Sequence, residues 1–403
     1  ITRRRVLKGS AAAGLVGLAG CTGGGGGGGA RTISHAVLMP ETGDLASVGR
    51  PIRDAALLPF LQLEDAETGF SFDYQVGDTQ TDPQAGISAA ESLVNAGYPS
   101  VTGPATSGVN LQVTRDVLIP NEVVGISPSS TSIDVTSLDD SDFIYRTAPS
   151  DALQGPAIGR IGSDRLGAAS ASVMFVNNNY GQALTDEFTA GFSGDTTATV
   201  AFEKEQPSYS SRLEEALADD PDMMVIIGYP ASGIQIFRDF YAEFDTDTDI
   251  VVTDGLRDPN LPGEVGSDMT NVIGTAPASG GPGADNFADT FESEYGNAPG
   301  VFTSQAYDAT AVAMLANIAA GENTGVGVRD NLRAVANPGG TEYGPAELAD
   351  AVAAVAAGDE VNYVGASSSV DFDDNGDITS ASYEIFSFTA DGVETQSTID
   401  FGA

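Results

Sequence analysis

The sequence predicts an α/β protein made of two Rossmann-like lobes, each a parallel β-sheet covered by helices. First, from residue 32 onward, short runs typical of strands alternate with longer segments of helical periodicity. Second, this alternation pauses after residue 127 and starts again near residue 171. Third, residues 31–403 are long enough for two domains of about 100–200 residues each. Because such alternation forms parallel sheets with helices on both faces, two rounds of it predict two lobes.

The elements follow in chain order within each lobe. In the first round, the expected strands are 33–38, 71–76, 100–103 and 123–127, and the expected helices are 51–67, 86–96 and 109–118. In the second round, the expected strands are 171–176, 198–202, 223–227 and 249–253, and the expected helices are 182–192, 211–218 and 233–244. We expect three crossovers near residues 149, 278 and 366. The first lobe would then hold 31–149 and 279–366, and the second lobe 150–278 and 367–403.

The first thirty residues have the features of an export signal followed by a tether. Residues 1–20 combine a basic block with paired arginines and an apolar run shorter than the roughly 20 residues that span a bilayer. They resemble a twin-arginine signal, and Leu18-Ala19-Gly20-Cys21 resembles a lipoprotein cleavage site. We therefore expect Cys21 to be lipidated, the alternative being an ordinary thiol. Residues 21–30 are glycine-rich, which predicts a flexible tether that holds the protein at the extracytoplasmic face of the membrane.

The composition predicts a strongly acidic surface. Fifty-seven acidic residues outnumber 17 basic ones, for a formal net charge of −40. Removing residues 1–20, which hold four basic and no acidic residues, takes the charge to −44 and leaves Lys204 as the only lysine. Nucleic acid is excluded as a partner, because binding phosphates requires clustered Lys and Arg. At molar salt the Debye length is about 3 Å, so most of this self-repulsion is screened. The composition therefore resembles that of proteins from very salty environments.

Polar groups suited to a small ligand follow the expected strands. In α/β folds of this type, ligands bind beyond the carboxyl ends of the strands, and a cleft between two lobes favours binding there. The first lobe offers hydroxyl-rich loops at 103–108 and 127–131, which suit a carboxylate. The second lobe offers loops at 177–181, 228–230 and 253–255, with two tyrosines and a carboxylate. Together these loops fit a zwitterion that carries an apolar tail.

Five motifs in the same order resemble the leucine/isoleucine/valine-binding proteins, which have the type I periplasmic-binding fold of ABC importers. The resemblance covers essentially residues 31–390. The motifs are Glu41-Thr42-Gly43-Asp44 with Gly49, Asp78-Thr79-Gln80-Thr81-Asp82-Pro83, Ile119-Pro120 through Ile126-Ser127-Pro128-Ser129-Ser130-Thr131, Phe143-Ile144-Tyr145-Arg146-Thr147-Ala148-Pro149-Ser150-Asp151, and Tyr180-Gly181. The chain departs from the family at Val48, where many members carry an aromatic residue.

The resemblance implies a set of ligand contacts from both lobes. The expected contacts are the hydroxyls of Ser107 and Thr131, the backbone of Ser129, the carboxylate of Asp254 and the rings of Tyr180 and Tyr229. The hydroxyls would bind a ligand carboxylate, the acidic side chain would accept from an α-ammonium group, and the rings would close over the ligand. Each position also has a structural alternative: helix capping for the serines and threonine, a turn for the aspartate, and packing between lobes for the tyrosines.

The resemblance implies a solute-binding protein that captures a small amino acid of the branched-chain type, or a related polar solute. Hinge motion would close the lobes over the ligand, and an ABC transporter permease would recognise the closed form. One alternative is the same scaffold binding urea, an amide or an aromatic acid. Another is a sensory binding module that reports to a signalling receptor.

Enzymatic and metal-dependent functions are not expected. A Ser-His-Asp triad needs a histidine base, and the only histidine, His35, lies within the first expected strand. No Cys/His cluster exists for zinc, and no cofactor is expected. Residues 371–378 resemble the start of a calcium-binding loop, but Ser382 stands where a bidentate glutamate is required, so a turn is favoured.

Overall fold

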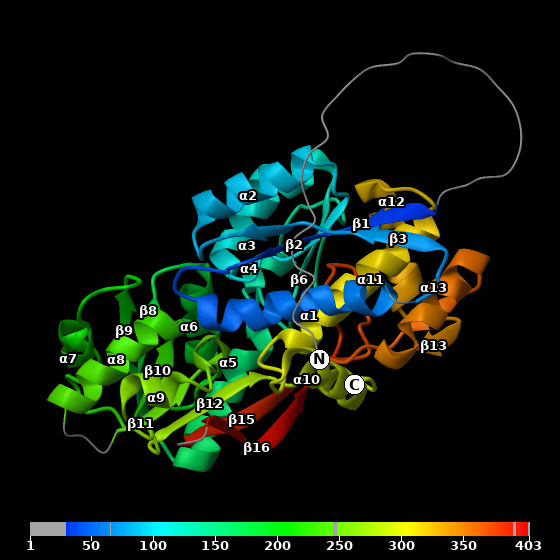
Figure 1. Ribbon diagram of the computed structural model, residues 1–403. Coiled ribbons are helices and arrows are strands. Elements are labelled where there is room, and N and C mark those ends of the chain that lie inside the picture. Colours follow the sequence, from blue (N-terminus) through cyan, green and yellow to red (C-terminus); the bar gives the residue numbers. More distant parts are fainter. Residues whose placement is uncertain (1–29, 65, 245–247, 390–391, 402–403) are drawn as a thin grey trace, which may run out of the picture.

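The structure is a computed structural model that describes residues 30–401 except 65, 245–247 and 390–391. The chain forms two lobes that lie side by side, each with its own β-sheet (Figure 1). The α/β class and the parallel sheets predicted from the sequence are confirmed. The expected signal segment, Cys21 and the glycine run lie outside the described residues.

The first lobe is built on a five-stranded parallel sheet of order β4-β2-β5-β6-β7. Its strands are β2 (Ala36–Met39), β4 (Val76–Asp78), β5 (Ser100–Thr102), β6 (Val124–Ser127) and β7 (Ile144–Arg146). Two short pairs flank it: β1 (Arg31–Ser34) with β3 (Phe70–Asp73), and β13 (Thr341–Tyr343) with β14 (Val361–Tyr363). Because all strands of the five-stranded sheet are parallel, their carboxyl ends and the loops that follow them lie at the same edge of the sheet.

The second lobe is built on a seven-stranded sheet of order β16-β15-β12-β11-β10-β8-β9. Its parallel strands are β8 (Ser170–Val176), β9 (Asp195–Phe202), β10 (Met223–Ile227), β11 (Asp249–Val252) and β12 (Val272–Pro277). Two antiparallel strands, β15 (Ala381–Thr389) and β16 (Gly392–Phe401), complete the sheet. The central strand β10 is buried along its whole length, as its unbroken apolar sequence predicts for a strand covered on both faces.

Helices pack against the sheets and each other within each lobe. Those of the first lobe are α1 (Ala46–Glu64), α2 (Pro83–Asn95), α3 (Ser107–Val113), α4 (Ile133–Thr136), α10 (Ala284–Tyr295), α11 (Thr303–Ala320), α12 (Gly325–Ala336) and α13 (Leu348–Ala357). Those of the second lobe are α5 (Asp151–Arg160), α6 (Asn179–Gly191), α7 (Ser210–Ala216), α8 (Pro230–Glu243) and α9 (Leu261–Val265). Helix α11 is buried on nearly all sides, because it carries mostly small and apolar residues around its circumference and packs between α1, α12, α13 and the sheet.

The chain passes between the lobes three times. It leaves the first lobe after β7, returns after β12 and enters the second sheet again at β15. Before β15, residues 367–378 hydrogen-bond with the first lobe: Asp308 accepts from Ser367, and Arg146 donates to Asp377. We infer that the third crossover follows residue 378, whereas the sequence placed it near 366.

Two element boundaries differ from the sequence-based expectation. The expected strand 33–38 is divided at His35 into β1 and β2, which pair with different neighbours. His35 is buried, and its ring nitrogens contact the hydroxyls of Ser100 and Thr102, which gives it a role in the core. Helix α1 begins at Ala46, five residues before the expected start at Pro51.

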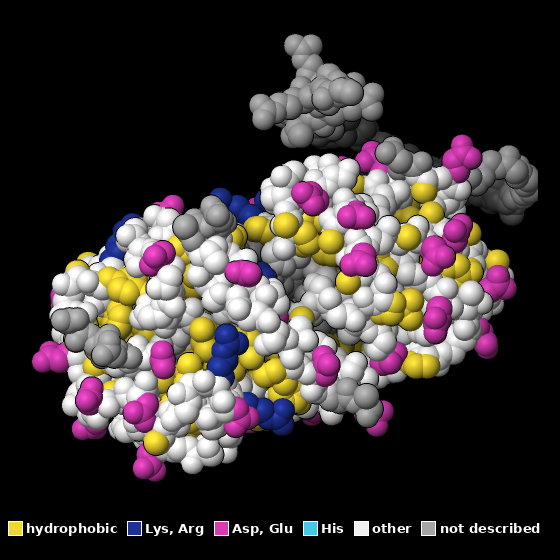
Figure 2. All heavy atoms as spheres, turned by 90° about the horizontal axis from the view of Figure 1, so that it is seen from below, with side chains coloured by type: hydrophobic (Ala, Val, Ile, Leu, Met, Phe, Trp, Pro, Cys, Tyr) yellow, Lys and Arg dark blue, Asp and Glu magenta, His cyan; other side chains and the backbone are white. Residues whose placement is uncertain are grey.

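Acidic side chains are scattered over both lobes on the face shown in Figure 2, where basic side chains are few. This distribution agrees with the excess of acidic residues in the sequence. Among the residues that the structure describes, no helix has both the length and the apolar character needed to cross a membrane.

Candidate ligand-binding site between the lobes

A cavity lies between the lobes, beyond the carboxyl ends of strands from both sheets. It encloses about 320 Å³ of empty space, including the space open to solvent. Its lining residues are Leu45, Val48, Ile52, Ala105, Thr106, Ser107, Ser129, Tyr180, Tyr229, Asp254, Gly255 and Phe302. Five of the six expected contact residues therefore lie around one cavity, whereas the sixth, Thr131, is buried and does not line it.

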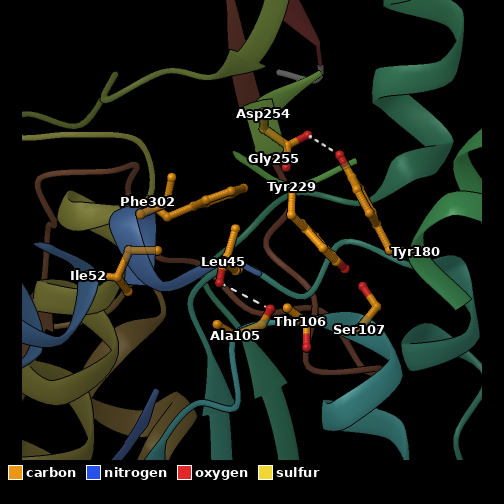
Figure 3. Close-up of a pocket in the computed structure, with 12 residues that line it drawn as sticks. Leu45, Ile52, Ala105, Thr106, Ser107, Tyr180, Tyr229, Asp254, Gly255 and Phe302 are labelled. Atoms are coloured by element: carbon orange, nitrogen blue, oxygen red, sulfur yellow. Dashed lines mark hydrogen bonds between the residues drawn. The ribbon is translucent and has the colours of Figure 1, made fainter. Parts of the chain in front are cut away.

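Ser107 presents a hydroxyl at the first-lobe end of the cavity (Figure 3). It is the first residue of α3, and its Oγ accepts a hydrogen bond from the backbone N–H of Ser132 at 3.3 Å. The hydroxyl hydrogen is therefore available to donate to a ligand. The capping alternative does not describe this loop, because Ser107 caps no helix and Ser132, rather than Thr131, caps α4.

Ser129 lies in the neighbouring loop, and a buried arginine holds that loop in place. The Oγ of Ser129 donates to the carbonyl of Ala105 at 3.1 Å, which joins the two hydroxyl-rich loops. Just beyond Ser129, the guanidinium of Arg146 donates to the carbonyls of residues 130–132 at 3.4, 3.0 and 2.8 Å. Arg146 is fully buried and also pairs with Asp377. Arg146 is thus a positioning residue for the loop that lines the cavity.

The contact between Arg146 and Asp377 also explains the segment that resembles a calcium loop. Both carboxylate oxygens of Asp377 accept from Arg146, and one also accepts from Thr136. The carboxylate of Asp373 accepts from the backbone N–H groups of Asn375 and Asp377, which closes a tight turn. In the described part of the chain, no group of three or more His, Cys, Asp or Glu residues is placed to hold a metal.

Two glycines allow the second lobe to bring its polar groups to the cavity. A Cβ on Gly181 would lie 2.0 Å from the carbonyl oxygen of Val176, so only glycine lets α6 start directly over the end of β8 and present Tyr180. A Cβ on Gly255 would lie 2.4 Å from the carbonyl oxygen of Gly228. This close approach seats the loop after β11 against the loop after β10, which carries Tyr229.

Tyr180 and Tyr229 form one wall of the cavity. Their rings are stacked, with centroids 5.8 Å apart and an interplanar angle of 15°. The hydroxyl of Tyr180 contacts Thr253 at 2.7 Å and donates to Asp254 at 3.2 Å, while Tyr229 accepts from Asn178 at 3.1 Å. Each ring is therefore fixed at its hydroxyl end, with its body free to cover an apolar group.

Asp254 lies at the end of the cavity opposite Ser107 (Figure 3). It begins a short 3₁₀ turn (Asp254–Leu256), and its carboxylate accepts a hydrogen bond from Tyr180. Burial raises the pKa of Asp254 to about 6, although hydrogen bonds from Gln154 and Tyr180 act in the opposite direction. A buried carboxylate without a cation is costly, so this end of the cavity favours a positively charged group.

A second buried carboxylate, Asp151, lies near enough to Asp254 to be affected by its charge, and the sequence analysis did not assign it a role. Its backbone N–H donates to the carbonyl of Thr131 at 2.8 Å, but its two carboxylate oxygens accept no hydrogen bond from the described residues. The Thr131 hydroxyl lies near this carboxylate, yet no bond of normal geometry joins them. Burial, reinforced by the charge of Asp254, raises the pKa of Asp151 to about 8. In the sequence, the only indication of a role for Asp151 was its place as the last residue of the motif at 143–151.

The remaining wall is apolar and was not predicted. Val48 and Ile52 come from the start of α1, and Leu45 and Phe302 are the residues before α1 and α11. In Figure 3 the side chains of Ile52 and Phe302 lie across the cavity from the two tyrosine rings. At Val48, where the sequence departs from the pattern that the resemblance implies, a small aliphatic side chain lines the cavity. An apolar ligand group fits between these walls.

Two lobes with crossovers between them and a polar cavity in the cleft define a solute-binding protein. A family model described as periplasmic binding protein matches residues 32–346. The chain belongs to this family, and it is of the leucine/isoleucine/valine-binding type with the type I periplasmic-binding fold. The family resemblance seen in the sequence is thereby confirmed. Membership of the family places the protein outside the cytoplasm, and its relatives are binding proteins rather than enzymes.

The relatives include proteins of two kinds. The chemotactic signal transduction system substrate-binding protein BasB of Halobacterium salinarum is 27% identical over 336 residues, which cover 81% of this chain and 78% of BasB. The leucine-, isoleucine-, valine-, threonine-, and alanine-binding protein of Pseudomonas aeruginosa is 25% identical over 316 residues, which cover 76% and 83%. The crystal structure of the leucine-binding protein LivK of Thermotoga maritima is similar in fold, with a TM-score of 0.77 at 22% identity, covering 91% and 98%.

Proposed function

We propose that this protein captures an α-amino acid with an apolar side chain of the branched-chain type. The observation that carries the proposal is a single cavity that combines a buried carboxylate, a free hydroxyl donor and an apolar wall. Asp254 would accept from the α-ammonium group, and the Ser107 hydroxyl would donate to the α-carboxylate. The side chain would lie between the tyrosine rings and the wall formed by Ile52 and Phe302. The name of the relative in Pseudomonas aeruginosa supports this ligand class.

The two buried carboxylates favour a cationic group over a neutral or anionic ligand. An aromatic acid without an amine would place its negative charge in a cavity next to the Asp254 carboxylate, and the repulsion would oppose binding. Urea or a simple amide would donate hydrogen bonds but would leave the apolar wall unfilled. An α-ammonium group pairs with the first carboxylate directly and lowers the electrostatic cost of the second.

We propose delivery of the ligand to an ABC transporter permease as the main biological role. The second candidate is reporting to a signalling receptor, which is favoured by the similarity to a chemotactic substrate-binding protein. A strain that lacks this protein separates the two. Loss of leucine uptake with normal chemotaxis supports transport, whereas loss of chemotaxis toward leucine with normal uptake supports signalling.

The thermal stability of the purified protein at molar NaCl tests the ligand class. The panel holds apolar amino acids, urea, amides and benzoate, each at high excess. A ligand at 1,000 times its dissociation constant stabilises the folded state by about 4 kcal/mol, which gives a large rise in melting temperature. We expect only the apolar amino acids to raise the melting temperature in this way. A rise with benzoate or urea and none with amino acids would contradict the proposal.

Lipid anchoring at Cys21 follows from the sequence at the start of the chain. We expect the Cys21→Ser variant, which lacks the thiol needed for a thioether link, to appear in the medium. The wild-type protein should remain with the membrane fraction, and cell fractionation followed by immunoblotting measures both. Retention of the variant on membranes to the same extent would contradict the lipid anchor.

Binding should release protons near pH 6. The pKa of Asp254 is raised to about 6 and that of Asp151 to about 8, so in the ligand-free protein at pH 6 Asp254 is about half protonated and Asp151 is mostly protonated. A cationic ligand stabilises the ionised form and lowers these pKa values, so binding releases about half a proton or more. Affinity should therefore rise as the pH increases from 5 to 7. Calorimetric titrations of L-leucine in phosphate and in Bis-Tris at pH 6 measure the release. Equal binding enthalpies in the two buffers would show that no proton is released.

A further inference from the structure

Several polar contacts join the two lobes directly across the cleft, and most of them involve one residue, Asp44. Asp44 lies in the first lobe, between β2 and α1, and is only 2% exposed. One carboxylate oxygen accepts from the backbone N–H of Ser232 at 2.8 Å. The hydroxyl of Ser232 also lies 2.9 and 3.1 Å from the two oxygens. Ser232 belongs to α8 of the second lobe, so these bonds exist only when the lobes are in contact.

Helix α8 has no cap of its own. Its N-cap residue, Tyr229, makes no side-chain capping bond, and its first residue is Pro230, which has no N–H. The next two N–H groups, those of Ala231 and Ser232, donate to the carbonyl oxygen and the carboxylate of Asp44 at 3.3 and 2.8 Å. A residue of the opposite lobe thus satisfies donors that a helix normally satisfies with its own N-cap side chain.

This contact lies next to the ligand cavity in both lobes. Leu45, which follows Asp44, and Tyr229, which precedes α8, both line the cavity. We propose that Asp44 is a positioning residue that latches the lobes together: it caps α8 only in the closed state and so raises ligand affinity without touching the ligand. The inference rests on the proposed function, because affinity for the ligand is what the latch would increase.

Two further contacts of the same kind support a latch. The Nζ of Lys204 in the second lobe donates to the carbonyl of Thr81 in the first lobe at 2.5 Å. The side-chain amide of Asn179 in α6 donates to Asp134 in α4 at 3.2 Å. Lys204 is the only lysine between residues 21 and 403, so its amine provides a chemical reporter of closure.

The Asp44→Ala variant tests the latch through ligand affinity. We expect L-leucine to bind about 2- to 30-fold more weakly, the range expected for the loss of one helix cap, chiefly through faster dissociation. Ser232→Ala should also weaken binding, but much less so when Asp44 is already alanine, since the two side chains act as a pair. The matched control is Asp222→Ala. One oxygen of Asp222 accepts from the backbone N–H groups of Ala169 and Ser170 within the second lobe, and its loss should leave affinity unchanged.

Acetylation of Lys204, followed by mass spectrometry, gives a second readout. L-leucine should protect Lys204 in the wild type, and protection should be weaker in Asp44→Ala at equal ligand saturation. Equal affinity and equal labelling in the two proteins, with and without L-leucine, would overturn the latch. If the wild type binds no leucine but Asp44→Ala still labels faster, the latch stands and the proposed ligand fails.

Discussion

Replacing Asp254 with asparagine should weaken L-leucine binding by more than tenfold, a loss of over about 1.4 kcal/mol. The substitution keeps an oxygen that can accept from Tyr180, whose hydroxyl lies 3.2 Å from the carboxylate in the wild type. It removes the negative charge that would pair with the α-ammonium group, and hydrogen bonds between charged partners are the stronger ones. Isothermal titration calorimetry at molar NaCl and pH 7.5 measures the difference.

The same variant should be no less stable than the wild type without ligand. Because burial raises the pKa of Asp254 to about 6, its ionised form opposes folding above that pH, and a neutral amide removes this penalty. The matched control is Asp258→Asn in the same loop, since Asp258 is also buried but bonds to Asn260 and does not line the cavity. Equal affinities of the wild type and Asp254→Asn for L-leucine would show that the Asp254 carboxylate does not bind the ligand.

Replacing Arg146 with methionine should lower the free energy of unfolding by about 3–5 kcal/mol, the usual effect of removing one partner of a buried ion pair. The guanidinium is fully buried, pairs with Asp377 and donates to three successive carbonyls of residues 130–132. Methionine fills much of the volume but leaves these acceptors buried and unpaired. Urea unfolding at molar NaCl measures stability. Leucine affinity should also fall, because the loop that carries Ser129 and Thr131 loses its support.

The matched control for the burial of Arg146 is the variant Arg238→Met. Arg238 is exposed, and among the described residues it donates only to the carbonyl of Glu264, so its loss should change stability by no more than about 1 kcal/mol. The loss of stability in Arg146→Lys should lie between those of Arg146→Met and Arg238→Met, because a lysine keeps the charge but not the planar set of donors. An Arg146→Met protein as stable as the Arg238→Met protein would show that the loop does not depend on this arginine.

The two sheets and the polar loops that line the cavity could be predicted from the sequence, because both depend on local patterns. Strands and the loops that follow them can be recognised from neighbouring residues. For this reason Ser107, Tyr180 and Asp254 could be predicted to lie in loops around one site. Beyond residue 253 the same reasoning assigned no elements. Helix α11 (Thr303–Ala320) is apolar on all sides, so it lacks the polar face by which a surface helix is recognised.

Other features of the site depend on contacts between distant parts of the chain. Nothing local distinguishes Ile52 or Phe302 from core residues, yet both line the cavity. Asp44 stood in the first family motif, but its partner Ser232 lies 188 residues away in the other lobe. Asp151 stood at the end of another motif, and only the folded chain reveals that its carboxylate is buried without a hydrogen-bond partner among the described residues.

The most direct test of the central claim compares L-leucine with 4-methylpentanoate, the same molecule without its amino group. Calorimetric titration of the wild type with each at molar NaCl and pH 7.5 isolates the contribution of the α-ammonium group. If the cavity holds an amino acid through Asp254, L-leucine will bind and 4-methylpentanoate will bind at least tenfold more weakly. Equal binding of the two, or binding of the acid alone, would contradict the account.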